Sequence, residues 1–252
     1  MHCSQIQADY GSSVSYHRTL YEAAALVAQS LADTLQNPTS TREAQSAINC
    51  CEKWGYAQQF SPEALNTLYP LLLSLITHPE LSCRVCKCLD EWLASVPSEK
   101  YADQLLDYFA SDHMTSLLQT AYNEQNTEEP VLSHVKLLIT LFENTTKQIA
   151  TSLSSARSIA VVRNLLSVTS FSGQFPVDEE VSELSLTSWG LLQEELAEEG
   201  LLGESEIGNT ARQIYAALVE ALLGKITWPN ERELKGWPKG LSPSVVVSGM
   251  VS

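Results

Sequence analysis

The residues best suited to metal chemistry are one histidine and three cysteines that lie close together in the chain. Cys83, Cys86 and Cys88 follow His78, and a Cys-x2-Cys spacing is common in zinc sites, where three thiolates and one imidazole complete a tetrahedron. The same stretch has the apolar pattern of a single helix, on which Cys86 and Cys88 would point about 200° apart. We therefore favour small buried side chains at helix contacts, and a metal-binding or redox helical protein stays open as a rival hypothesis.

No arrangement of residues that would support catalysis is found. Lys225 in the run LLGKIT lacks the earlier glycine that a phosphate-binding loop requires. After Gly203-Glu204-Ser205-Glu206, Ile207 stands where a nucleophile elbow has its second glycine, and no strand precedes the run. The histidines are scattered, and none is spaced to activate a nearby serine or cysteine. The sequence therefore predicts no catalytic residue, no cofactor and no enzymatic activity.

Acidic residues form the strongest local charge feature. Ten acids and no lysine or arginine occur between Asp178 and Thr210. On a helical scaffold such a surface would attract a basic partner and speed its association, although acids on a solvated helix face can also serve solubility alone. The predicted partner-binding residues are Asp178, Glu179, Glu180, Glu183, Glu194, Glu195, Glu198 and Glu199.

Composition and charge limit the possible class of protein. The chain has 252 residues, of which 44% are hydrophobic, enough for a sizeable core. Its formal net charge of −15 argues against binding nucleic acid directly. The N-terminus has no basic residues followed by an apolar run, so we expect no signal peptide. Without a signal peptide, the six cysteines are expected to be reduced and packed rather than joined in disulfides. No membrane span is expected, because no apolar stretch reaches the roughly 20 residues that a spanning helix needs.

Apolar residues recur at helical spacing along most of the chain, as in the series Leu20, Ala24, Val27, Leu31 and Leu35. Ser40 and Glu43 have the spacing of a capping box, and Ser61-Pro62-Glu63 has the residues of a helix start. The first helices of successive hairpins are predicted to begin near 18, 61 and 100, at spacings of 43 and 39 residues. These spacings match HEAT and armadillo repeats, and the next predicted start is near 155.

These patterns predict an all-α fold, namely a HEAT/armadillo-like α-solenoid of antiparallel helix hairpins, with an irregular helical bundle as the alternative. The predicted organisation is an irregular N-terminal extension over 1–17 and helical repeats over 18–226. An inter-repeat loop and a disordered or artefactual tail are predicted for 227–252. Both ends resemble cuts through a longer superhelix, so exposed apolar faces and self-association are expected.

One stretch of the sequence resembles a known family. The run FPVDEEVSELSLTSW at 175–189, followed by LQEEL at 192–196, resembles a segment of the importin-β superfamily of nuclear transport receptors. Within this superfamily it is most similar to the importin-thirteen and transportin-SR branch. Weaker similarity to the helices and the next inter-repeat loop of that branch occurs at 50–70, 228–231 and 235–238, so the resemblance runs from about 18 to 239.

The resemblance implies a karyopherin, a superhelix that shuttles between nucleus and cytoplasm. Such a receptor binds protein cargo and the Ran GTPase on its inner surface and phenylalanine-glycine nucleoporins on its outer surface. The Ran-binding repeats of the family lie at the N-terminus of a much longer chain, and nothing before Leu20 supplies them. After Gly240 the sequence LSPSVVVSGMVS stands where the family continues into helices. We therefore expect an internal fragment.

Two hypotheses follow for the function of such a fragment. The first is a protein-binding segment of a nuclear import receptor that captures basic protein cargo without covalent chemistry. The second is a non-transport HEAT-repeat scaffold or regulatory subunit, which the same repeats would serve equally well. Only the identity of the partner separates them.

Overall fold

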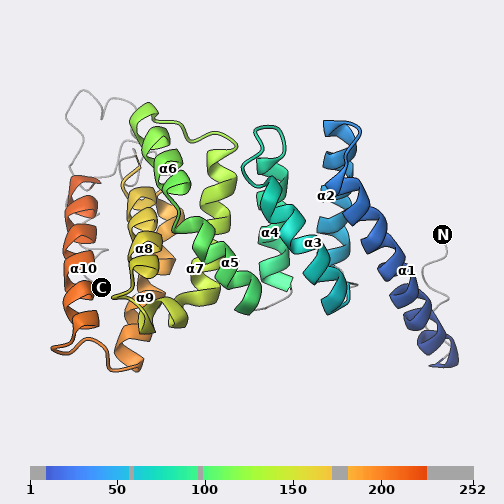
Figure 1. Ribbon diagram of the computed structural model, residues 1–252. Coiled ribbons are helices and arrows are strands. Elements are labelled where there is room, and N and C mark those ends of the chain that lie inside the picture. Colours follow the sequence, from blue (N-terminus) through green and yellow to red (C-terminus); the bar gives the residue numbers. More distant parts are fainter. Residues whose placement is uncertain (1–9, 57–59, 96–98, 172–180, 226–252) are drawn as a thin grey trace, which may run out of the picture.

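The computed structural model describes residues 10–56, 60–95, 99–171 and 181–225, and all regular elements in these ranges are helices. The predicted all-α fold is confirmed. The elements are α1 (Tyr10–Gln36), α2 (Thr41–Tyr56), α3 (Pro62–Leu75), α4 (Ser82–Ser95), α5 (Glu99–Phe109), α6 (Asp112–Glu124), α7 (Val131–Thr151), α8 (Ala156–Thr169), the short 3₁₀ helix η2 (Glu183–Ser185), α9 (Leu186–Glu198) and α10 (Glu206–Lys225). They follow one another from α1 on the right of Figure 1 to α10 on the left.

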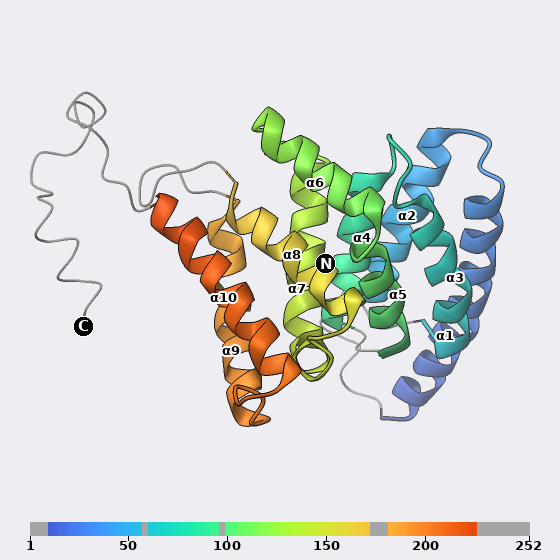
Figure 2. The ribbon, with the colours of Figure 1, turned by 60° about the vertical axis from the view of Figure 1, so that its left-hand side comes forward.

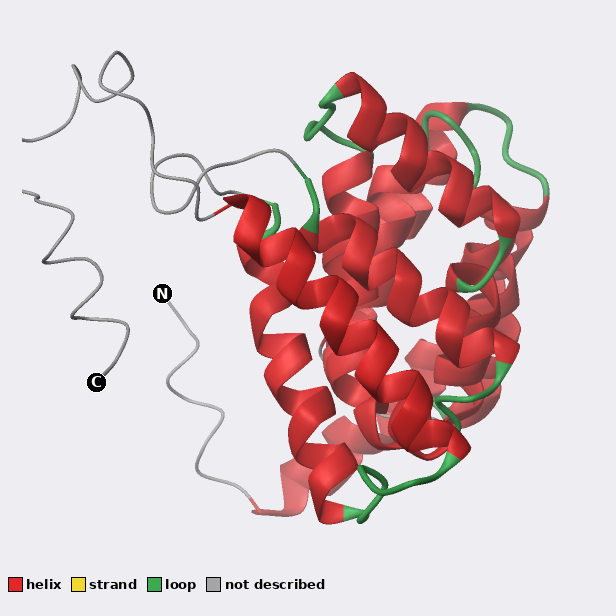
Figure 3. Cartoon of the chain, turned by 90° about the vertical axis from the view of Figure 1, so that its left-hand side faces the viewer, coloured by secondary structure: helices red, strands yellow, loops and turns green. Residues whose placement is uncertain are grey.

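The helices form two layers. The B layer consists of α2, α4, α7 and α9, and each of these helices packs on the next one. The A layer consists of α1, α3, α5, α6, α8 and α10; α1 packs on α3, and α8 contacts α5, α6 and α10. Because each helix packs mainly on the adjacent helices of its own layer, and no extensive contact joins described elements that are far apart in the chain, the architecture is the predicted α-solenoid (Figure 2). Figure 3 views the stack from its α10 end.

Local sequence signals explain where the A-layer helices begin. Ser61 accepts a hydrogen bond from the Ala64 amide, and Ser155 accepts one from the Ser158 amide, so α3 and α8 have serine N-caps. The observed starts of α3, α5 and α8 lie within one residue of the predicted 61, 100 and 155. Helix α1 begins at Tyr10, earlier than the predicted 18. The loop and tail predicted for 227–252 lie outside the described residues.

The third hairpin departs from the regular pattern, because its first helix is divided. The apolar residues between Tyr101 and Leu118 are interpreted from the sequence as one helical segment. In the structure α5 ends at Phe109, and Ser111 caps a new helix by accepting a hydrogen bond from the Met114 amide. The hairpin therefore contains α5, α6 and the long α7, which accounts for the wider interval before α8.

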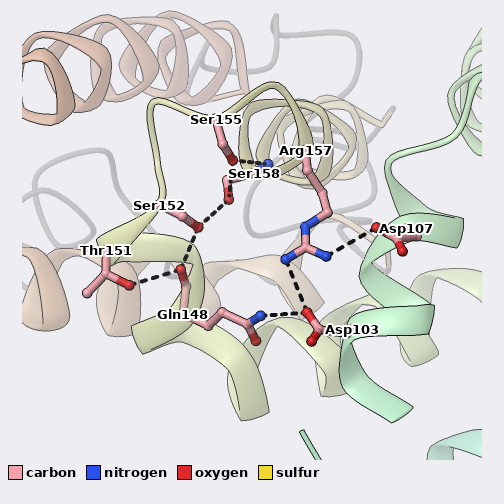
Figure 4. A network of polar contacts seen from close by, with 8 residues as sticks. All are labelled: Asp103, Asp107, Gln148, Thr151, Ser152, Ser155, Arg157 and Ser158. Atoms are coloured by element: carbon pink, nitrogen blue, oxygen red, sulfur yellow. Dashed lines mark hydrogen bonds and ion pairs between the residues drawn. The ribbon is translucent and has the colours of Figure 1, made fainter. Parts of the chain in front are cut away.

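A polar joint holds α5 against the following helices (Figure 4). The guanidinium of Arg157, on α8, lies 3.1 Å from a carboxylate oxygen of Asp103 and 3.1 Å from one of Asp107, both on α5. Gln148, on α7, donates to the Asp103 carboxylate at 2.7 Å. One arginine therefore joins two turns of α5 to the start of α8.

The apolar core runs along the stack rather than around one centre. Fully buried leucines occur in both layers from α3 to α9, and the buried residues form one continuous cluster. No helix in the described ranges is long and apolar enough to cross a membrane.

Candidate partner-binding surface

Four of the predicted partner-binding residues are brought together at the end of α9. Glu194, Glu195 and Glu198 belong to its last turns, and Glu199 follows as the C-cap. All four side chains are exposed or half-buried. Spacings of three and four residues place helix side chains next to one another, so the sequence pattern alone is enough to cluster these carboxylates. We call these four residues the α9 acidic cluster.

The remaining predicted residues do not join this cluster in the described part of the chain. Glu183 is exposed but belongs to η2, at the opposite end of α9. Glu194 is eleven positions after Glu183, which corresponds to about 16 Å along a helix. Asp178, Glu179 and Glu180 lie outside the described residues.

A lysine from the neighbouring B-layer helix reaches the α9 acidic cluster. Lys147, on α7, has its ammonium nitrogen 2.6 Å from a carboxylate oxygen of Glu199. The hydrogen bond that Lys147 donates to the Glu199 carboxylate raises the pKa of Lys147, and the charges of Glu195 and Glu198 add to this effect. The sequence does not reveal this contact, because it depends on the stacking of α7 on α9. The structure therefore already places one cation at these carboxylates.

The position of the cluster works against the stability of α9. The C-terminal end of a helix carries a partial negative charge, so an acid there costs about 0.3–1 kcal/mol where the same acid at the N-terminus would stabilise. Glu194 and Glu198 are like charges four residues apart, as are Glu195 and Glu199, which adds repulsion. Helix stability therefore gives no reason for these acids, whereas a cationic partner would relieve both costs.

A second acidic pair lies on the B layer, between α4 and α7. Burial raises the pKa of Glu143, on α7, and the nearby carboxylate of Asp90, on α4, raises it further. One carboxylate oxygen of Asp90 is buried and has no hydrogen-bond partner within the described ranges. Glu143 is one helical turn from Lys147. Negative charge therefore occurs on three successive B-layer helices, α4, α7 and α9.

The described half of the sequence run at 175–189 has a structural role. The indole nitrogen of Trp189 donates to the hydroxyl oxygen of Thr169 at 2.9 Å, and the hydroxyls of Thr169 and Ser185 are 2.8 Å apart. Ser185 also donates to the carbonyl of Ser182 at 2.7 Å, and Tyr215 donates to the carbonyl of Trp189 at 2.9 Å. This buried network fixes α9 between α8 and α10 and so positions the acidic cluster.

The structure does not bring the four candidate zinc ligands together. Cys86 and Cys88 are fully buried in helix contacts, and burial raises the pKa of both thiols. Cys83 is half-buried, with its sulfur 3.2 Å from a carboxylate oxygen of Glu129, and His78 accepts a hydrogen bond from a backbone amide. Among the described residues no three histidine, cysteine or acidic side chains converge on one point.

His134 is a buried titratable residue at the start of α7. It is 2% exposed, and its Nδ1 lies 3.1 Å from the carbonyl oxygen of Pro130. Its Nε2 has no hydrogen-bond partner among the described groups, and the ring of Tyr108 lies 6.2 Å away. Burial lowers the pKa of His134 below its usual value of 6.5, and the nearby His113 lowers it further.

Acidification is therefore expected to destabilise the fold through His134. The unfolded chain binds a proton at this residue at a higher pH than the folded chain does, so stability is complete above the ordinary histidine pKa and falls below it. The loss reaches at most about 1.4 kcal/mol per pH unit, until the folded-state pKa is passed. Urea unfolding of the native chain and of His134→Gln at pH 7.5 and 5.5 measures this effect. A loss of equal size in His134→Gln would assign it to other groups. His78→Gln, at an exposed histidine, serves as control.

Comparison with known proteins gives matches of low sequence identity. Importin-13 of Gallus gallus is 22% identical over 196 residues, which make up 77% of this chain and 20% of that protein. Importin-13 of Mus musculus is 23% identical over an alignment of 213 residues that covers 68% of this chain and 22% of that protein. Importin-13 of Bos taurus is 28% identical over 103 residues, covering 40% and 11%. This chain thus spans about a fifth of the length of its longest-matching relatives. No protein-family model matches it.

A solved structure agrees with these relatives. The structure titled "Importin13 cytosolic state" superposes with a TM-score of 0.66 at 21% identity, over 90% of this chain and 29% of that one. This match shows the same solenoid fold. Together the sequence relatives and the fold confirm the resemblance to the importin-β superfamily.

Proposed function

We propose that this chain is a protein-binding segment of a nuclear import receptor, which captures basic protein cargo through the α9 acidic cluster. Its similarity to importin-13 in sequence and fold supports the receptor role. The observation that carries the choice of cargo is the α9 acidic cluster, with four carboxylates gathered where they destabilise their own helix.

The proposed mechanism is electrostatic capture without covalent chemistry. Carboxylates on neighbouring B-layer helices would raise the local concentration of a positively charged segment and speed its association. The cargo would then compete with Lys147 for Glu199. This competition costs little, because an ion pair between exposed side chains contributes about 0–1 kcal/mol. Several arginine and lysine side chains of the cargo would then take the place of the single Lys147 ammonium at these carboxylates.

Other parts of the proposal rest on the superfamily resemblance. Binding of the Ran GTPase, binding of phenylalanine-glycine nucleoporins and shuttling between nucleus and cytoplasm are proposed for the longer receptor to which such a segment would belong. For the segment itself we propose cargo binding only.

Neutralising the α9 acidic cluster is expected to weaken binding of a basic partner. A variant with Glu194→Gln, Glu195→Gln, Glu198→Gln and Glu199→Gln should bind an arginine- and lysine-rich peptide at least about tenfold more weakly at low salt, which corresponds to about 1.4 kcal/mol. The difference should shrink at high salt, because screening weakens exposed charges. Fluorescence anisotropy of a labelled peptide gives both dissociation constants.

A matched variant separates a local effect from one of total charge. Asp33→Asn, Glu80→Gln, Asp112→Asn and Glu220→Gln remove the same number of charges from exposed positions away from α9. We expect this control to bind almost as the native chain does. If both variants lose the same affinity, the net charge of the chain explains binding and the α9 acidic cluster is not the site.

A further inference from the structure

A groove with a cavity volume of about 400 Å³ lies between α6 and the turn that leads into α7. One wall is a face of α6 that extends from His113 to Glu124, about 16 Å along the helix. The other wall contains Asn126, Pro130 and Val131. The groove belongs to an A-layer helix, whereas the α9 acidic cluster lies in the B layer. The groove is therefore separate from the surface on which the proposed function rests.

The divided A-layer helix explains why this face of α6 is open. Helix α8 packs against both α5 and α6. On the preceding side α3 meets α5, where the rings of Tyr69 and Tyr101 stack at 4.3 Å and the Tyr69 hydroxyl donates to the Tyr101 carbonyl at 2.7 Å. Among the described elements, no A-layer helix packs extensively on the preceding side of α6. The break at Ser111 therefore leaves one side of three turns of α6 without an extensively packed A-layer neighbour in the described part of the chain.

The lining of the groove combines an apolar floor with polar edges. Leu117, Ala121 and Val131 form the floor. The hydroxyls of Ser116 and Thr120 line one edge and make no hydrogen bond within the described ranges, whereas the adjacent Thr115 donates to the carbonyl of Ser111. The groove thus offers hydrogen-bonding groups that a bound segment could use.

The charge of the groove is one-sided. Glu124 lines its end, and Glu128 is exposed in the following turn. Neither carboxylate forms an ion pair within the part of the chain that the structure describes, and no lysine or arginine lines the groove. A ligand that covers the apolar floor would be favoured if it also carried a positive charge at this end.

We propose that this groove binds a short segment of a partner protein that carries an apolar side chain and a nearby lysine or arginine. The apolar side chain covers Leu117, Ala121 and Val131, and the cation pairs with Glu124. A length of about 16 Å corresponds to about five residues in extended conformation. Because the floor is small, the affinity is in the micromolar to millimolar range.

The test uses the full chain and three five-residue peptides, each of which contains one leucine. The two residues that flank the leucine are lysines in the lysine peptide, glutamates in the glutamate peptide and glutamines in the glutamine peptide. The titration is repeated in the variant that lacks the α9 acidic cluster, so that binding at that surface does not contribute. Isothermal titration calorimetry or NMR shifts of amides in α6 report binding. We expect the lysine peptide to bind at least fivefold more tightly than the glutamine peptide, and the glutamate peptide to bind least.

Two substitutions at exposed positions of α6 locate the site. Glu124→Lys should weaken the lysine peptide at least fivefold, and Thr120→Trp should fill the groove and abolish binding of all three peptides. Gln119→Trp, an exposed position outside the groove lining, should bind like the native chain. Unchanged binding by Thr120→Trp, equal affinity for the lysine and glutamine peptides, or no binding at millimolar peptide would each overturn the proposal. If basic peptides do not bind at the α9 acidic cluster but the lysine peptide binds in this groove, only the proposed function is refuted.

Discussion

Gly55→Ala is expected to lower the free energy of unfolding by about 3 kcal/mol, because the new methyl group would overlap an indole ring. A Cβ atom at residue 55 would lie 2.0 Å from Nε1 of Trp92. The ring cannot move away easily, since Trp92 is 3% exposed, packs edge-on against Phe60 and donates to the carbonyl of Cys51 at 3.0 Å. Urea unfolding followed by circular dichroism measures the change.

Gly190→Ala is the matched control for this substitution. Residue 190 lies within α9, and a Cβ there would meet no atom within 4 Å. Alanine favours the helix over glycine by about 0.5–1 kcal/mol, so this variant should be slightly more stable than the native chain. If Gly55→Ala were as stable as Gly190→Ala, this result would contradict the close contact between residue 55 of α2 and the ring of Trp92.

Trp189→Ala is expected to cost about 4 kcal/mol of unfolding free energy, the largest effect of any single substitution discussed. The side chain is 4% exposed, and its loss would leave a cavity between α8, α9 and α10. It would also remove the donor to Thr169, whose hydroxyl is fully buried. Chemical unfolding again provides the measurement, with hydrogen exchange of α9 amides as a local readout.

Trp189→Phe separates the two contributions. It keeps most of the buried ring but removes the indole N–H, so we expect a loss of about 1–2 kcal/mol from the missing hydrogen bond to Thr169 and the smaller ring. A loss as large as that of alanine would mean that the hydrogen bond dominates. No loss in either variant would contradict the structural role of residues 181–189.

The helical organisation could be predicted because its signals are local. Ser61-Pro62-Glu63 supplies an N-cap, a first-turn proline and an acid, and α3 begins at Pro62 as expected. The capping box predicted from Ser40 and Glu43 forms only in part. The Glu43 amide donates to the Ser40 hydroxyl as a capping box requires, but the Glu43 carboxylate accepts from Thr39 rather than from Ser40.

The break between α5 and α6 was not predicted, although two signals in the sequence indicate it. Leu117 is nine positions after Tyr108, which would place the two on opposite faces of one continuous helix. Ser111 followed by Asp112 is an N-cap residue before a first-turn acid. The groove on α6 follows from the same break and was therefore also missed.

Part of the candidate surface could be predicted, namely the clustering of acids within α9. Contacts between helices could not, because they depend on how the helices stack. Lys147 reaches Glu199 from α7, and Asp90 lies near Glu143 although the two belong to different helices. The cysteines illustrate the opposite case. The spacing of Cys83, Cys86 and Cys88 suits zinc, but the helix that contains them turns Cys86 and Cys88 into buried contacts.

Hydrogen exchange on the full chain, with and without an arginine- and lysine-rich protein domain, tests most directly whether the α9 acidic cluster captures basic cargo. The proposed function predicts slower exchange in the last turns of α9 and at the end of α7 around Lys147, with the amides of A-layer helices other than α6 unchanged. The protection should disappear when Glu194, Glu195, Glu198 and Glu199 are replaced by glutamine. Protection confined to the A layer, or protection that survives those four substitutions, would contradict it.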